Sequence, residues 1–186
     1  MQPSRRIDGH PTHRINGFAV RAGKPYPLGV TPVPGGINFA IFSRHATTCT
    51  LVLFLRGELQ PFGEIPIPPE FVVGRVYAIT VFGLNPEDLE YGFRMDGPHL
   101  PHQGQRFDPS QILLDPYARA VSGRDMWGDI PRADNPFQHR GLFTADDYDW
   151  EDDRPPDIPI QDLVIYEMHI RGFTRHPSSG SKYAGS

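Results

Sequence analysis

Glycine and proline occur along the whole of this chain, and they limit its possible secondary structure more than any other feature of the sequence. Its 186 residues include 19 Gly and 21 Pro. Because proline breaks a helix interior and glycine weakens one, this density argues for many turns, short strands and few long helices. Hydrophobic residues make up 38% and aromatic residues 11%, which is enough apolar side chain for a packed core.

Charge and hydropathy exclude several classes of partner. With 18 Lys+Arg against 22 Asp+Glu, the net charge of −4 gives no reason to expect nucleic-acid binding. The longest strongly apolar run, residues 51–55, is far shorter than the ~20 residues of a membrane helix, and the start is not a signal peptide. We therefore expect no membrane partner and a cytoplasmic location, with a plastid as the alternative if a presequence is missing.

Cysteine and histidine spacing argues against a metal site. The single cysteine, Cys49, excludes an internal disulfide and a zinc site built from several thiolates. Two pairs of histidines are spaced three residues apart, but each contains a proline and has no third ligand nearby; they are His10 with His13, and His99 with His102. We expect no metal and no cofactor.

Four short apolar runs between turn residues are typical of antiparallel strands. They occupy residues 36–43, 50–55, 74–82 and 91–95, and the second is apolar on both faces, as in a central strand. Alternation places Tyr77, Ile79 and Val81 on one face of the third run. The pattern predicts a mainly β fold, an antiparallel immunoglobulin-like β-sandwich over residues 1–98, in which residues 1–31 are irregular.

Residues 99–186 differ from the sandwich region in composition. Residues 99–161 are rich in proline, become acidic near their end, and predict an extended connector. Residues 163–170 read LVIYEMHI, a near-continuous apolar run that turns polar, as in a buried parallel strand. Too few residues follow for a helix and a partner strand, so residues 162–186 are expected to be the start of a truncated second domain.

No side-chain pattern identifies a reaction by itself. The acidic cluster of residues 146–153 lacks the burial that separates the pKa values of a glycosidase pair, and it predicts a solvated connector. Trp127 and Trp150 could stack on sugar rings or pack the connector against a neighbouring domain. Glu167 and His169, at the end of the last apolar run, are the best site candidates by position.

Several motifs follow one another along the chain. The first two are PLGVT at 27–31 and GINFAIFS at 36–43, and YGFRMDGP follows at 91–98. Next come GQRFDP at 104–109, LLDPYA at 113–118 and DYDW at 147–150, and residues 163–180 include YEMHIRGFT at 166–174. In this order the motifs resemble those of isoamylase-type and bacterial glycogen-debranching enzymes of the α-amylase superfamily. There the third motif ends the sandwich, the next three belong to the linker, and the last marks the entry to the catalytic barrel.

This resemblance implies a carbohydrate-binding-module-like sandwich, a connector, and the first strand of a truncated (β/α)8 barrel. The implied activity is retaining hydrolysis of α-1,6 branch linkages in α-glucans such as glycogen or limit dextrin. In the family the three catalytic carboxylates lie on later barrel strands, so we expect no catalytic residue here, only ones beyond Ser186, and an inactive chain. The resemblance gives Tyr166, Glu167, His169 and Arg171 a supporting structural role at the barrel strand.

Departures from the family pattern put glycan contact by the sandwich in question. Tyr77 stands where the family usually has tryptophan, while Asp108 and Gln111 replace a common asparagine and lysine. Tyr77, Trp127 and Trp150 are therefore candidates either for glycan contact or for domain packing. The alternatives left open are a stand-alone glycan-binding or enzyme-docking module, and another superfamily member such as a branching enzyme or a trehalose-releasing hydrolase.

Overall fold

The computed structural model describes residues 9–123, 139–144 and 149–185. It divides into two compact units, one up to Asp146 and one from Asp147. Within the described residues, the first unit is built from antiparallel strands and the second contains the one α-helix, which is too short and polar to cross a membrane.

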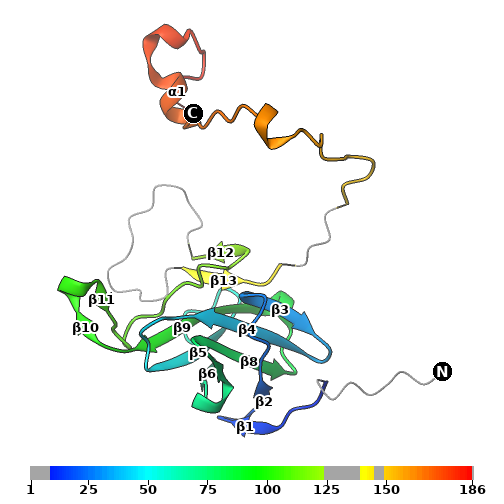
Figure 1. Ribbon diagram of the computed structural model, residues 1–186, viewed down its shortest axis with the longest axis vertical. Coiled ribbons are helices and arrows are strands. Elements are labelled where there is room, and N and C mark those ends of the chain that lie inside the picture. Colours follow the sequence, from blue (N-terminus) through cyan, green and yellow to red (C-terminus); the bar gives the residue numbers. More distant parts are fainter. Residues whose placement is uncertain (1–8, 124–138, 145–148, 186) are drawn as a thin grey trace. The chain divides into compact units, whose positions relative to one another are not determined.

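Two sheets make up the first unit (Figure 1). Among the described residues, one sheet has the order β1-β2-β8-β4-β3, with β7 also paired to β8, and the other has the order β12-β13-β9-β5-β6. A separate hairpin pairs β10 with β11. The strands of the first sheet are β1 His13–Ile15, β2 Phe18–Ala22, β3 Gly29–Val33, β4 Gly36–Phe42, β7 Val72–Val73 and β8 Val76–Phe82. The others are β5 Thr48–Leu55, β6 Gly63–Pro66, β9 Leu89–Asp96, β10 His99–Leu100, β11 Gln105–Arg106, β12 Ala120–Ser122 and β13 Arg140–Leu142.

The core lies between the two sheets and follows the alternation of the strands. On β8 the side chains of Tyr77, Ile79 and Val81 point into it, as the sequence predicts, and on β9 Tyr91 and Phe93 do the same. Cys49, the second residue of β5, is also buried there, and this burial raises its pKa to about 12. The predicted immunoglobulin-like sandwich is confirmed. Further core residues are Val20, Val30, Ile37, Phe39, Ile41, Leu51, Leu53, Ile65, Ile67, Phe71, Leu89 and Met95.

The predicted irregular start is wrong within residues 13–31, where β1, β2 and the beginning of β3 lie. Of the prolines that suggested irregularity, Pro11 precedes β1, and Pro25 and Pro27 lie between β2 and β3. Pro32 lies inside β3, opposite Ile37, at the edge of the sheet, where a residue without an N–H group is tolerated. Pro34 and Gly35 then turn the chain into β4, and Gly35 has φ of +75°, which a glycine adopts without strain.

The sheet also continues past residue 98. β12 and β13 pair with each other, and β13 pairs with β9 through Gly141 opposite Tyr91. Residues 120–122 and 140–142 therefore are not an extended connector but strands of the sandwich. Their three-residue length carries no periodicity that a sequence pattern could reveal.

The second unit lacks the strand predicted over residues 163–170. Residues 163–169 have no regular structure and are exposed, and α1, Ile170–Arg175, begins where the strand was expected to end. A strand needs a hydrogen-bonded neighbour, and the described part of the chain pairs none with this segment. Where the structure is described, the short 3₁₀ helices are Pro69–Phe71, Pro86–Asp88, Pro101–Gln103, Ile160–Asp162 and Pro177–Ser179.

Candidate functional site

A cavity of about 310 Å³ opens at the β10–β11 hairpin of the sandwich. Its lining comes from residues 43–45 just after β4, from residues 104–108, and from Gln111 and Leu113. These segments lie far apart in the sequence, so the cavity exists only because the hairpin folds back on the turn that follows β4. It combines apolar side chains with amide, carboxylate and guanidinium groups.

Close contacts fix each wall of this cavity. Phe107 packs against Gly97, where an added Cβ would lie 2.8 Å from the ring. The ring nitrogen Nδ1 of His99 lies 3.3 Å from the Phe107 carbonyl oxygen. On the opposite wall Arg75 donates to the Arg44 carbonyl oxygen at 3.1 Å, and Leu113 pairs its backbone with Phe93. The cavity is therefore formed by ordered segments rather than by a single loop.

The polar side chains that line the cavity differ in how many hydrogen bonds they make. Asp108 Oδ1 accepts from the Ser110 hydroxyl at 2.6 Å and from the Ser110 backbone N–H at 2.9 Å, and these bonds lower the pKa of Asp108. The side-chain oxygen Oε1 of Gln105 is buried and has no partner among the residues described. Asp108 is thus a carboxylate at neutral pH, and Gln105 offers an unused acceptor.

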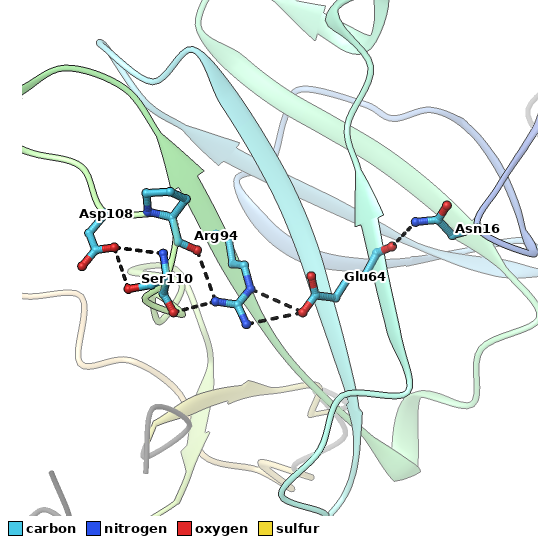
Figure 2. Close-up of polar contacts among 6 residues, drawn as sticks. Asn16, Glu64, Arg94, Asp108 and Ser110 are labelled. Atoms are coloured by element: carbon cyan, nitrogen blue, oxygen red, sulfur yellow. Dashed lines mark hydrogen bonds and ion pairs between the residues drawn. The ribbon is translucent and has the colours of Figure 1, made fainter. Parts of the chain in front are cut away.

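Beside the cavity, Arg94 holds the chain against the outer face of β9 (Figure 2). Its guanidinium donates to the carbonyl oxygens of Pro109 at 3.2 Å and Ser110 at 2.6 Å, and its other nitrogens lie 3.4 Å from Glu64 Oε1. The Asn16 side chain donates to the Glu64 carbonyl oxygen at 2.7 Å. One arginine therefore links β9, β6 and the segment that bears Asp108.

A buried ion pair joins β13 to β9 on the same sheet. Arg140 Nη1 lies 2.9 Å from Glu90 Oε2, and both side chains are about 5% exposed or less. The guanidinium also lies 3.9 Å from the centre of the Phe54 ring and donates to the Glu58 carbonyl oxygen. Glu90 Oε1 also accepts from the Gly57 backbone N–H at 3.3 Å, so both oxygens of this carboxylate are engaged and Glu90 has a structural role.

Asp115 is the second buried carboxylate. It accepts from the Tyr91 hydroxyl at 2.7 Å and from the Tyr117 backbone N–H at 2.9 Å. Burial raises the pKa of Asp115, and burial together with the Asp115 charge raises the pKa of Tyr91. Because Gly141 lies against the Tyr91 ring, this pair anchors residues 113–118 and β13 to the core.

The structure separates the aromatic residues that the sequence singles out. Tyr77 is 6% exposed in the sandwich core, and its hydroxyl donates to the Ala46 carbonyl oxygen at 2.7 Å. Trp150 is 64% exposed and lines a different cavity of the second unit with Arg154 and Pro155. Trp127 lies outside the described residues. Whether each contacts glycan or packs domains stays a prediction.

The residues expected to support a barrel strand lie in the second unit. Tyr166 is 74% exposed, and Glu167 is exposed as well. His169 caps α1, because its Nδ1 accepts from the Gly172 backbone N–H at 3.1 Å, and Arg171 lies within that helix. Their structural role in a barrel stays a prediction.

The described acidic side chains do not form a paired-carboxylate site. Asp149, Glu151, Asp152 and Asp153 are all exposed, while Asp146 and Asp147 lie outside the described residues. Within the described ranges no group of three or more histidine, cysteine or carboxylate side chains is placed to hold a metal ion.

Among the cavity residues, the sequence draws attention only to Asp108 and Gln111, as departures from the family pattern, and it does not group the lining as a site. GQRFDP was recognised as a linker motif, yet its Gln105 and Phe107 meet Arg44 only through the fold. One usable signal is Gly97 ahead of a short hairpin, since glycine permits a close approach by another segment.

Comparisons with known proteins agree on one family of domain. Residues 27–118 match the model of carbohydrate-binding module 48 (isoamylase N-terminal domain). Isoamylase 3, chloroplastic, of Oryza sativa subsp. japonica is 43% identical over 173 residues, covering 88% of this chain and 22% of that protein. The glycogen debranching enzyme of Pectobacterium atrosepticum is 37% identical over 180 residues, covering 90% of this chain and 26% of that protein.

Solved structures agree with the fold. Apo pullulanase from Paenibacillus barengoltzii gives a TM-score of 0.54 at 23% identity, covering 83% of this chain and 20% of that one. The same enzyme in complex with maltohexaose and α-cyclodextrin gives a TM-score of 0.51 at 22% identity, with 84% and 21% covered. The chain thus spans about a fifth to a quarter of the length of the curated relatives above.

Proposed function

Since residues 27–118 belong to the carbohydrate-binding module 48 family, the N-terminal domain of isoamylases, we propose that this chain is the glucan-binding, non-catalytic part of a debranching hydrolase. The substrate of the whole protein is an α-glucan such as glycogen or limit dextrin. The bond cleaved is the α-1,6 branch linkage, as the names of the debranching relatives suggest.

One observation carries this proposal. The chain is 37–43% identical to a glycogen debranching enzyme and to an isoamylase over 180 and 173 residues, far beyond the span of the sandwich model alone. The similarity therefore includes the second unit, where the sequence resembles the entry to a catalytic barrel. A binding module shared among unrelated enzymes would not extend the match in this way.

The side-chain chemistry supports a non-catalytic role for this part. Retaining hydrolysis needs a nucleophilic carboxylate and a carboxylic acid about 5–5.5 Å apart across the sugar. In the described part of the chain the two most buried carboxyls serve other partners, Glu90 with Arg140 and Asp115 with Tyr91. This supports the proposal that neither buried carboxyl takes part in the cleavage.

Glucan binding is supported by the family and by the neighbouring structures. A structural neighbour was solved with maltohexaose and α-cyclodextrin, which are α-glucans. The location we propose is the cytoplasm or, as for the chloroplastic relatives, a plastid. Neither a cofactor nor a metal ion is needed for acid–base hydrolysis of this kind.

The first test separates binding from cleavage. The purified 186-residue chain is run in native gels with and without glycogen, and it is also incubated with limit dextrin. We expect retarded migration in glycogen and no release of reducing ends. Unchanged mobility contradicts glucan binding by this chain, and reproducible release of reducing ends contradicts its non-catalytic role.

The second test addresses the whole protein. An antibody raised against the chain is used to isolate the native protein from its source, and the isolated protein is incubated with limit dextrin. We expect release of short linear chains at branch points. A protein that binds glycogen and leaves the branches intact contradicts the hydrolase proposal and identifies a stand-alone binding module instead.

A further inference from the structure

We infer that the cavity at the β10–β11 hairpin is a subsite for a short, uncharged segment of an α-glucan chain. The α-glucan identity rests on the proposed function, whereas the position and the chemistry rest on the cavity itself. The residues that carry the inference are Arg44, Gln105, Arg106, Phe107 and Asp108.

An unused acceptor is the first argument. Gln105 Oε1 is buried with no hydrogen-bond partner in the described part of the protein. Burying a carbonyl oxygen without a donor is unfavourable, and native proteins seldom leave one unsatisfied. Since Gln105 lines the cavity, a rotation of its side chain would present this oxygen to a hydroxyl group of a ligand there.

Two unused cations are the second argument. Arg44 and Arg106 both line the cavity, and neither guanidinium has a hydrogen bond or an ion pair within the described residues. A guanidinium presents several N–H donors in a plane, which suits neighbouring hydroxyl oxygens of one sugar. The cavity thus offers donors as well as an acceptor.

Asp108 decides between an anion and a neutral sugar. Its bonds to Ser110 lower its pKa, so the wall carries a negative charge at neutral pH. Beside the two guanidinium groups of Arg44 and Arg106, this carboxylate offsets part of the positive charge and accepts from a hydroxyl group, a bond that an ionised phosphate or carboxylate cannot donate. A neutral polyol can donate to Asp108 and Gln105 and accept from the arginines, so it uses every kind of group present.

Size and apolar lining complete the argument. At about 310 Å³ the cavity lies at the small end of the roughly 300–1,000 Å³ typical of ligand pockets, and it suits a short chain segment. Phe107 and Leu113 supply apolar surface for the C–H face of a pyranose ring. Maltotriose is therefore the probe of choice.

Isothermal titration calorimetry on the 186-residue chain tests the subsite, with Gln105→Leu and Arg106→Ala as variants. Each should weaken maltotriose binding by about tenfold, as expected for losing one hydrogen bond to a ligand. The matched controls are Gln103→Leu on the same hairpin and Arg56→Ala elsewhere on the sandwich, both exposed and outside the cavity. They should bind as the wild type does. Because Arg106 is exposed, its variant remains informative even if Gln105→Leu disturbs folding.

The outcomes separate this inference from the proposed function. Equal binding by wild type and both cavity variants overturns the subsite and leaves glucan binding intact. Displacement of maltotriose by inorganic phosphate overturns the neutral-sugar assignment. If the chain does not bind maltotriose while the native protein still cleaves limit dextrin, the subsite is wrong and the debranching proposal stands.

Discussion

The sandwich and the second unit, residues 149–185, belong to one chain. Strand-like apolar side chains are nevertheless buried in the sandwich and exposed in the second unit. Phe93 in the sandwich is fully buried, whereas Val164 and Ile165 in the second unit are 95% and 85% exposed. Both regions contain apolar runs of strand-like sequence. The difference shows that such a run becomes a strand only when the same chain supplies hydrogen-bonded neighbours and a facing layer.

The largest expected effect tests this difference directly. Phe93→Ala should lower the free energy of unfolding by about 3–5 kcal/mol because it leaves a cavity in a packed core. Ile165→Ala should change it by less than about 0.5 kcal/mol, as for most surface substitutions. Urea denaturation followed by circular dichroism measures both. Similar losses for the two variants would mean that the second unit has a core of its own.

The next largest effect concerns how far the sandwich extends. Arg140→Met leaves Glu90 buried without its cation and should cost about 3–5 kcal/mol in urea denaturation. The double variant Glu90→Gln/Arg140→Met should recover part of this loss. Arg154→Met in the second unit is the matched control, and its stability should equal that of the wild type. A mild effect of Arg140→Met would show that β13 adds little to the sheet.

Removing the exposed apolar segment of the second unit should raise the solubility of the chain. A chain that ends at residue 157 lacks Val164, Ile165 and Tyr166, and it should stay in solution at higher concentration than the full chain because exposed strand-like segments promote association. Light scattering against concentration measures this. If the shorter chain aggregates earlier, the removed residues protect the sandwich.

The smallest effect depends on pH and separates two carboxyls within the sandwich. Burial raises the pKa of Asp115 in the folded state, so its contribution to stability is full below the unfolded pKa and is lost as pH rises through the folded pKa. Asp115→Asn does not titrate. Its stability relative to wild type should therefore improve between pH about 3.5 and neutral pH.

Asp108→Asn provides the opposite trend as a control. Because the pKa of Asp108 is lowered, its contribution is present above the unfolded pKa and is lost as pH falls through the folded value. The variant should lose stability relative to wild type as pH rises from strongly acidic values to the unfolded pKa of about 3.9, and the difference should then stay constant up to neutral pH. Identical pH trends for the two variants in urea titrations would contradict the assigned causes.

Local alternation predicted the centre of the sandwich well, and tertiary pairing determined the rest. The runs that became β4, β5, β8 and β9 were recognisable because each is long enough to show its faces. β12 and β13 were not, since three residues show no period. The strand predicted at residues 163–170 failed for the converse reason: its sequence fits a strand, but no described neighbour pairs with it.

The candidate site was less predictable than the fold. Alternation correctly placed Tyr77 on the same face of its strand as Ile79 and Val81. Its hydroxyl bond to Ala46 depends on a loop 31 residues away in the sequence. The cavity likewise joins residues 43–45 to residues 104–108, and nothing local in either segment shows that they meet. Chemistry-bearing residues were visible in the sequence, whereas their proximity was not.

Hydrogen exchange of the full 186-residue chain, with and without maltotriose, tests the central claim most directly: an ordered sandwich holds the glucan site and residues 163–169 take no part in it. We predict slow exchange in β4, β5, β8 and β9, rapid exchange at residues 163–169 in both samples, and added protection at residues 43–45 and 104–111 when the sugar is present. Sugar-dependent protection confined to residues 163–169, or none within the sandwich, would contradict the account.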